Sequence, residues 1–89
     1  MTTIDELLQT VRNHYPNANT EIIERAYALA TKAHAGQKRM NGDPFITHSL
    51  GTGFLLAKWR LPADIIAAGI LHDVPEDTQR TLEDIEKNF

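Results

Sequence analysis

The chain has 89 residues and no cysteine, so it is long enough for one domain with a modest core and contains neither disulfides nor a zinc site built on thiolates. Its net charge of −3 argues against general nucleic-acid binding, which needs a dominant basic face. The longest apolar run, residues 65–71, is too short to cross a bilayer, and the first four residues lack the pattern of a secretory signal. We therefore expect residues 1–89 to form a single cytoplasmic domain with no membrane or nucleic-acid partner.

Capping signals and apolar spacing predict two helices in the first third of the chain. Thr3 and Glu6 fit a capping box, and this first helix should end before Pro16. Residues 17–20 offer caps for a second helix that runs to about Ala35, with Gly36 as its stop. The residues expected on the inner sides of these helices are Ile4, Leu7, Leu8, Val11, Ile22, Ile23, Ala26, Tyr27, Ala30 and Ala33.

Residues 37–47 are predicted to be a loop, followed by a third helix over residues 48–58. The dipeptide at residues 41–42 also suits a hairpin turn, but its flanks do not alternate apolar and polar residues, so we favour a loop. Within the third helix, Gly51 and Gly53 each cost up to about 1 kcal/mol relative to alanine, which indicates close packing or a substrate that needs room. The residues expected to face inward are Leu50, Phe54, Leu55 and Ala57.

The stretch from Ala63 to Asp77 combines an apolar run with a cluster of ionisable groups. Residues 65–71 indicate an element buried on nearly every side, and its length and alanines favour a helix over a strand, with Pro62 in its first turn. A fifth helix should follow from Thr81, with Ile85 and Phe89 on its apolar side. The whole pattern predicts an all-α bundle of about five helices.

The end of this apolar helix carries residues that suit a metal site. His72 and Asp73 are neighbours whose side chains can converge on an ion beyond the helix end, and His48 is the best candidate for a third ligand. Nitrogen and oxygen donors without sulfur suit Mn²⁺, Fe²⁺, Co²⁺ or Zn²⁺. Glu76 and Asp77 could orient a water molecule and take its proton, or act as acid toward a leaving group.

Each of these residues also has a plain structural interpretation. A short pair such as His72-Asp73 often arises by chance, and Glu76 and Asp77 alone would most often form a solvated helix end. Pro75 lacks the amide hydrogen that a continuing helix needs, so the two carboxylates could lie in a separate turn. Tyr27 and Trp59 are most simply core residues, and His34 is expected to be structural. Lys38 and Arg39 are first interpreted as solvated loop charges.

Four segments in order resemble the N-terminal hydrolase domain of the RelA/SpoT family, within the HD superfamily of metal-dependent phosphohydrolases. These segments are residues 33–39, 42–48, 67–78 and 81–85, and the likeness extends from about residue 20 to residue 89. The resemblance implies an all-helical HD-like fold, a Mn²⁺ cofactor and removal of the 3′-pyrophosphate from the alarmone (p)ppGpp, a guanosine polyphosphate.

The resemblance also assigns roles to individual residues. It implies that the metal ligands are His48, His72 and Asp73, that Glu76 and Asp77 activate water, and that Arg39 and Asn41 contact the substrate. Met40 departs from the family, in which a basic residue usually follows the arginine. Family members also continue past residue 89 and supply a further metal-binding aspartate, so we expect this chain to be a front part of the domain with weak metal affinity and little turnover.

Two other functions remain compatible with the sequence. The chain could be a non-catalytic helical module that binds a nucleotide or associates with itself, and a shortened domain with uncovered apolar surface predicts a homo-oligomer. Alternatively, it could be an HD hydrolase for a different nucleotide, a possibility that Met40 leaves open.

Overall fold

The computed structural model describes residues 3–72 and residue 74. This part of the chain contains four α-helices, α1 (Ile4–His14), α2 (Thr20–Ala33), α3 (Phe45–Lys58) and α4 (Ala63–Leu71), and its β-structure is limited to one isolated bridge between Lys38 and Pro44. The predicted all-α class is therefore confirmed. The predicted fifth helix lies outside the described residues.

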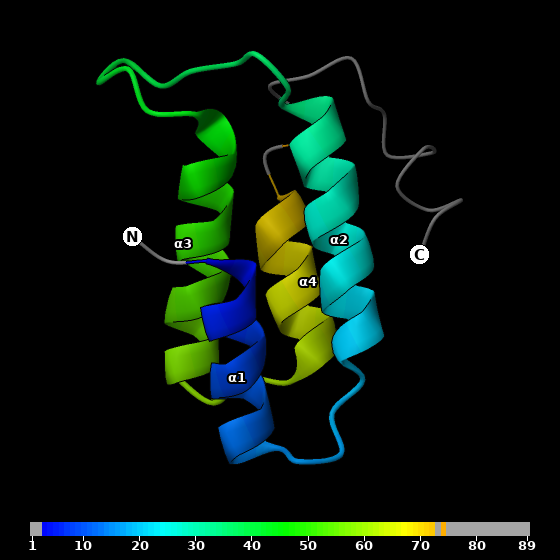
Figure 1. Cartoon of the computed structure of the whole chain (residues 1–89). Coiled ribbons are helices and arrows are strands. Elements are labelled where there is room, and N and C mark those ends of the chain that lie inside the picture. The colour runs from blue at the N-terminus through cyan, green and yellow to red at the C-terminus, as the bar shows by residue number, and fades with distance from the viewer. Residues whose placement is uncertain (1–2, 73, 75–89) are drawn as a thin grey trace.

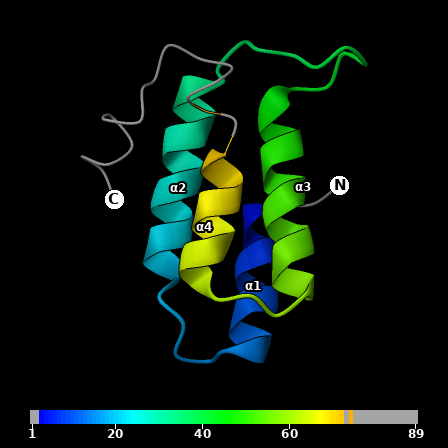
Figure 2. The same ribbon diagram turned by 180° about the vertical axis from the view of Figure 1, so that it is seen from behind.

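The four helices form an up-and-down bundle with α4 packed against both α2 and α3 (Figure 1). The view from behind places α4 and α1 on opposite faces, with α2 and α3 on either side of them (Figure 2). The α2–α3 loop, residues 34–44, lies at one end of the bundle, and the α1–α2 and α3–α4 connections lie at the other. As a result, the end of α2, the beginning of α3 and the end of α4 share the end that carries the α2–α3 loop.

Local signals in the sequence account for the ends of α1 and α2. The Thr3 hydroxyl accepts a hydrogen bond from the Glu6 amide at 3.2 Å, as the capping box requires. Helix α2 ends at Ala33, two residues before the expected end, and Gly36 follows with a positive φ of 77°. Both helices therefore begin and end close to the predicted residues.

The core lies between all four helices and is made of aliphatic side chains. Its fully buried members include Leu7, Val11, Ile23, Ile66 and Ile70. No helix of the described residues combines the length and the apolar character needed to cross a membrane.

Two glycines allow α3 and α4 to approach closely. A Cβ atom added at Gly53 would lie 2.8 Å from Ile70 Cγ1, and one added at Gly69 would clash with Leu56 Cδ1. By contrast, a Cβ atom at Gly51 would meet no described heavy atom within 4 Å. The prediction of close packing is therefore confirmed at Gly53, whereas Gly51 faces open space.

Helix α3 begins at Phe45, three residues before the predicted start. Pro44 is its N-cap, and the Pro44 carbonyl accepts the Thr47 amide at 3.0 Å. The loop before α3 makes the tight turn that the sequence pattern did not favour. The Arg39 amide donates to the Asp43 carbonyl at 2.9 Å, and Gly42 has a φ of 89°. Side-chain alternation was the wrong criterion, because the turn is held by local hydrogen bonds and glycine at positive φ rather than by strands.

Three predicted core positions are wrong. Leu55 is 46% exposed and Trp59 is 64% exposed, because the buried stripe of α3 consists of Ser49, Leu50, Gly53 and Ala57. Leu55 is two residues from both Gly53 and Ala57, which turns it away from that stripe. Ile65 is 45% exposed, so α4 is not buried on nearly every side.

A hydrogen bond joins the two connections at the end of the bundle away from the α2–α3 loop. The Tyr15 hydroxyl donates to the Arg60 carbonyl, and Arg60 has a positive φ of 62°, which is unusual outside glycine. Pro62 precedes α4 as its N-cap instead of occupying the first turn, and its carbonyl accepts the Ile66 amide at 3.1 Å.

Candidate functional site

Two of the predicted metal ligands lie side by side. His48 is in the first turn of α3 and His72 caps the end of α4, and their ring centroids are 6.1 Å apart with an angle of 59° between the ring planes. Two imidazoles bound to one ion through bonds of about 2.1 Å keep their ring centres within about 6.5 Å of each other. The separation of the two rings is within this limit.

The hydrogen bond of His72 sets the ring in a form that suits ligation. Its Nδ1 atom lies 2.6 Å from the Gly69 carbonyl oxygen. Since a carbonyl only accepts hydrogen bonds, Nδ1 carries the proton, and in the neutral ring Nε2 keeps the lone pair. A metal-binding histidine is commonly oriented in this way, with the second ring nitrogen donating to a carbonyl.

The predicted acidic residues of the site lie outside the described part of the chain. These are Asp73, Glu76 and Asp77, so their roles as ligand and as catalytic carboxylates stay predictions. Within residues 3–72 and 74, no group of three histidine, cysteine, aspartate or glutamate side chains comes together. The donor set of the described residues is thus the histidine pair.

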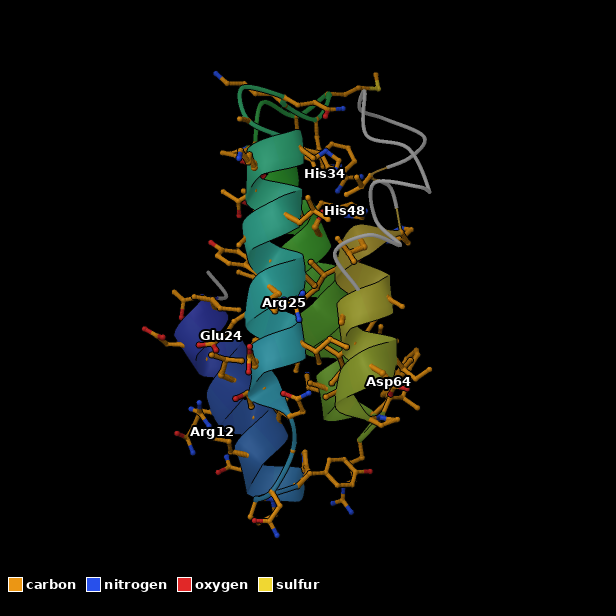
Figure 3. All side chains as sticks on the ribbon, turned by 90° about the vertical axis from the view of Figure 1, so that its right-hand side faces the viewer. Arg12, Glu24, Arg25, His34, His48 and Asp64 are labelled. Carbon is orange, nitrogen blue, oxygen red and sulfur yellow. The ribbon has the colours of Figure 1, made fainter. Side chains whose placement is uncertain are left out.

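A row of rings supports His48 from the side of α2. His34 is 2% exposed and stacks on Phe45 with a centroid distance of 4.4 Å, and Phe45 meets His48 edge-on at 5.5 Å. The Gln37 side-chain oxygen lies 2.9 Å from His34 Nδ1 and fixes the orientation of that ring. Figure 3 shows His34 and His48 close together at the end of the bundle that carries the α2–α3 loop. The structural role expected for His34 agrees with this burial.

Phe45 belongs to the site but was not predicted to do so. Phe45 lies three residues before His48, and this spacing places both on one side of a helix. Phe45 was predicted to lie in a loop because the helix was expected to begin at His48, so that spacing did not point to it.

The two predicted substrate-binding residues lie in the α2–α3 loop. Arg39 Nη1 is 3.2 Å from His48 Nδ1, so this exposed arginine contacts the histidine pair. Asn41 is engaged within the loop: its Oδ1 accepts the Asp43 amide at 3.0 Å and its Nδ2 donates to Asp43 Oδ2 at 3.2 Å. In this arrangement Asn41 stabilises the turn, as asparagine does in an Asx turn.

A hollow of about 450 Å³ lies beside this loop. It brings together two cations, an amide and an aromatic ring, which is a suitable surface for an anionic ligand with a planar part. Its lining residues are Lys38, Arg39, Met40, Asn41 and Phe45. A larger hollow of about 570 Å³ lies at the opposite end of the bundle, between the α1–α2 connection and the start of α4, and does not include the histidine pair.

Comparisons with known proteins agree on one family. The HD domain family matches residues 26–89. The chain is 43% identical over 89 residues to a GTP pyrophosphokinase of Streptomyces coelicolor. This alignment covers 97% of this chain and 10% of that protein. It is also 40% identical over 86 residues to a guanosine-3′,5′-bis(diphosphate) 3′-pyrophosphohydrolase of Aquifex aeolicus, and 36% identical over 85 residues to the bifunctional (p)ppGpp synthase/hydrolase SpoT of Escherichia coli. These alignments cover 97% and 96% of this chain and 12% of each relative, so the chain spans about a tenth of the length of the curated relatives it matches.

Proposed function

This chain belongs to the HD domain family, and from that premise we propose that it is part of a metal-dependent phosphohydrolase that removes the 3′-pyrophosphate from guanosine polyphosphates. The observation that carries the proposal is the approach of the His48 and His72 rings to 6.1 Å at one end of the bundle. The names of the relatives support the substrate class, since two of them are (p)ppGpp hydrolases by name.

The proposed cation site consists of His48, His72 and Asp73. We propose Mn²⁺ as the ion, because the resemblance to the RelA/SpoT hydrolase domain implies it. The imidazole and carboxylate donors without sulfur suit Mn²⁺, Fe²⁺, Co²⁺ and Zn²⁺ alike. When bound, the ion would polarise a phosphoryl oxygen and make water easier to deprotonate. Glu76 and Asp77 are the proposed groups that take the proton from the attacking water and return it to the leaving oxygen.

The proposed nucleotide position is the hollow beside the α2–α3 loop. Lys38 and Arg39 supply positive charge for phosphate oxygens, and the planar guanidinium of Arg39 can also stack on a base. Met40 is fully exposed and lines the same hollow with an apolar side chain, which weakens recognition of additional phosphates compared with a basic residue. Asn41 is expected to contact the nucleotide once the loop adapts to it.

We predict that the protein with Mn²⁺ releases pyrophosphate from ppGpp and leaves GTP largely intact. The assay is best run with protein in excess over nucleotide, so that a slow single turnover is visible. Replacing Asp73 by asparagine should abolish the release, because the change removes the proposed carboxylate ligand. The matched control is Asp64→Asn, since Asp64 is an exposed aspartate in the first turn of α4, at the opposite end of that helix (Figure 3).

Two outcomes would contradict this assignment. Equal hydrolysis of ppGpp and GTP would favour an HD hydrolase with a different or broader nucleotide preference. Activity that survives both Asp73→Asn and His72→Ala would refute the roles given to these residues.

Self-association is a second property that the structure supports. Leu55 and Trp59 are exposed, and their spacing of four residues places them on one side of α3. Burying such apolar side chains against another copy is favourable by about 25 cal/mol per Å².

We predict a homo-oligomer that Trp59→Lys dissociates, whereas Met40→Lys, an equivalent change at the α2–α3 loop, leaves it intact. Sedimentation velocity measures both, and a monomer at micromolar concentration in the unmodified protein would disprove the prediction.

A further inference from the structure

The contact between Arg39 and His48 fixes the tautomer of the histidine. Arg39 Nη1 lies 3.2 Å from His48 Nδ1. A guanidinium has five N–H donors and no acceptor, so in this contact Arg39 must donate and Nδ1 must accept. The neutral His48 ring therefore carries its proton on Nε2.

The two histidines of the candidate site thus hold opposite tautomers. His72 carries its proton on Nδ1, where the Gly69 carbonyl receives it, and His48 carries its proton on Nε2. A ring nitrogen can bind a metal ion only through a lone pair. In this arrangement the Nδ1 proton of His72 goes to a carbonyl, whereas His48 holds its proton on Nε2 and accepts from Arg39 at Nδ1.

Ligation by His48 and its hydrogen bond from Arg39 exclude each other. If the ion binds Nδ1, it takes the lone pair that Arg39 uses. If the ion binds Nε2, the ring proton must move to Nδ1, and the Nδ1 proton then faces the N–H groups of Arg39. In either case the divalent cation also repels the guanidinium at short range.

We propose that Arg39 is a positioning residue that competes with the metal ion for His48, so that binding of the cation and release of Arg39 are one event. This inference rests on the proposed metal site. Because Arg39 also lines the hollow beside the α2–α3 loop, its released guanidinium stays next to the position proposed for the nucleotide. A phosphate group that engages Arg39 withdraws it from His48, and linkage then requires that anion and cation each strengthen the binding of the other.

The first test measures Mn²⁺ affinity by isothermal titration calorimetry without nucleotide. Arg39→Met removes the donors but keeps the length of the side chain, and we expect it to raise Mn²⁺ affinity by about three- to tenfold, the range that corresponds to the net contribution of one hydrogen bond. The matched control is Lys38→Met, which removes the same charge from the neighbouring residue. It should change the affinity less, because no hydrogen bond between Lys38 and His48 is present among the described contacts.

The second test reads the tautomers directly in the metal-free protein. Nitrogen–proton correlation spectra of the histidine rings at about pH 8, where an ordinary histidine is neutral, should show His48 with its proton on Nε2 and His72 with its proton on Nδ1. In Arg39→Met, the His48 signals should shift toward a mixture of both tautomers, whereas in Lys38→Met they should stay unchanged.

The outcomes separate this inference from the proposed function. If all three proteins bind Mn²⁺ equally well, or if His48 carries its proton on Nδ1 in the unmodified protein, the competition is disproved while the metal site stands. If none of the proteins binds Mn²⁺, the metal site itself is disproved and the competition with it.

Discussion

Replacing His72 by alanine is expected to lower the affinity of the protein for Mn²⁺ by at least about a hundredfold and to abolish hydrolysis of ppGpp. Loss of a group that merely orients a metal ligand costs about 10- to 100-fold in metal affinity, and loss of the ligand itself should cost no less. His48→Ala should have a comparable effect, because the rings of His48 and His72 lie 6.1 Å apart and are proposed to bind the same ion. Calorimetric titration with Mn²⁺ measures the loss.

The control for this prediction is His14→Ala. His14 is an exposed histidine in the last turn of α1, at the end of the bundle away from the α2–α3 loop. Its replacement should leave Mn²⁺ affinity unchanged, and circular dichroism should confirm that all three variants keep their helices. If His72→Ala binds Mn²⁺ as tightly as His14→Ala, the histidine pair is not a metal site.

Alanine at Gly53 and alanine at Gly51 should change the stability of the bundle in opposite directions. A methyl group at Gly53 would lie 2.8 Å from Ile70 Cγ1 and 3.4 Å from Leu7 Cδ2, and both neighbours are fully buried. Overpacking of this kind costs about 1–3 kcal/mol, and over most of this range the cost is larger than the gain of about 1 kcal/mol from replacing a helical glycine. At Gly51, where the methyl group meets no described heavy atom within 4 Å, only the gain remains.

Urea denaturation tests this pair of variants. We expect Gly53→Ala to lower the free energy of unfolding by up to about 2 kcal/mol and Gly51→Ala to raise it by up to about 1 kcal/mol. The two variants have the same composition and differ only in where the methyl group lies. If both variants gain stability, α3 and α4 do not approach as closely as the structure places them.

The parts of the fold that could be predicted from the sequence depend on local interactions. The start of α1 follows from the Thr3 hydroxyl and the Glu6 amide, which are three residues apart, and the end of α2 follows from a glycine at positive φ. The apolar stripe of α1 was also predictable, because its period matches that of a helix facing a core on one side. These features need no knowledge of the other helices.

The exposure of Leu55 and Trp59 could not be predicted in this way. Helix α3 is apolar around much of its circumference, so its sequence alone does not show which side meets α1 and α4. The glycine at residue 53 decides the matter, because it allows Ile70 of α4 to approach and thereby fixes the rotation of α3. The positions of Leu55 and Trp59 follow from that contact, which is distant in sequence.

The candidate site was predictable in part for the same reason. His48 lies in the first turn of α3 and His72 caps the end of α4, and the bundle brings these two helix ends together, so the positions near helix ends were enough to suggest the pair. The contact between Arg39 and His48 depends on the conformation of the α2–α3 loop, where hydrogen bonds of Asn41 and Asp43 shape the turn. A sequence pattern does not specify that conformation, so the arginine was expected to be a solvated charge or a substrate contact, and its contact with His48 was not predicted.

The hydrogen bond from Tyr15 to Arg60 has a consequence for the two ends of the bundle. It ties the α1–α2 connection to the α3–α4 connection, so that both pairs of helices are held together at that end. The opposite end of the bundle, where α3 begins and α4 ends, lies away from this tie (Figure 1). The distance between the His48 and His72 rings, 6.1 Å, therefore depends on how closely α3 and α4 pack at the end opposite this hydrogen bond.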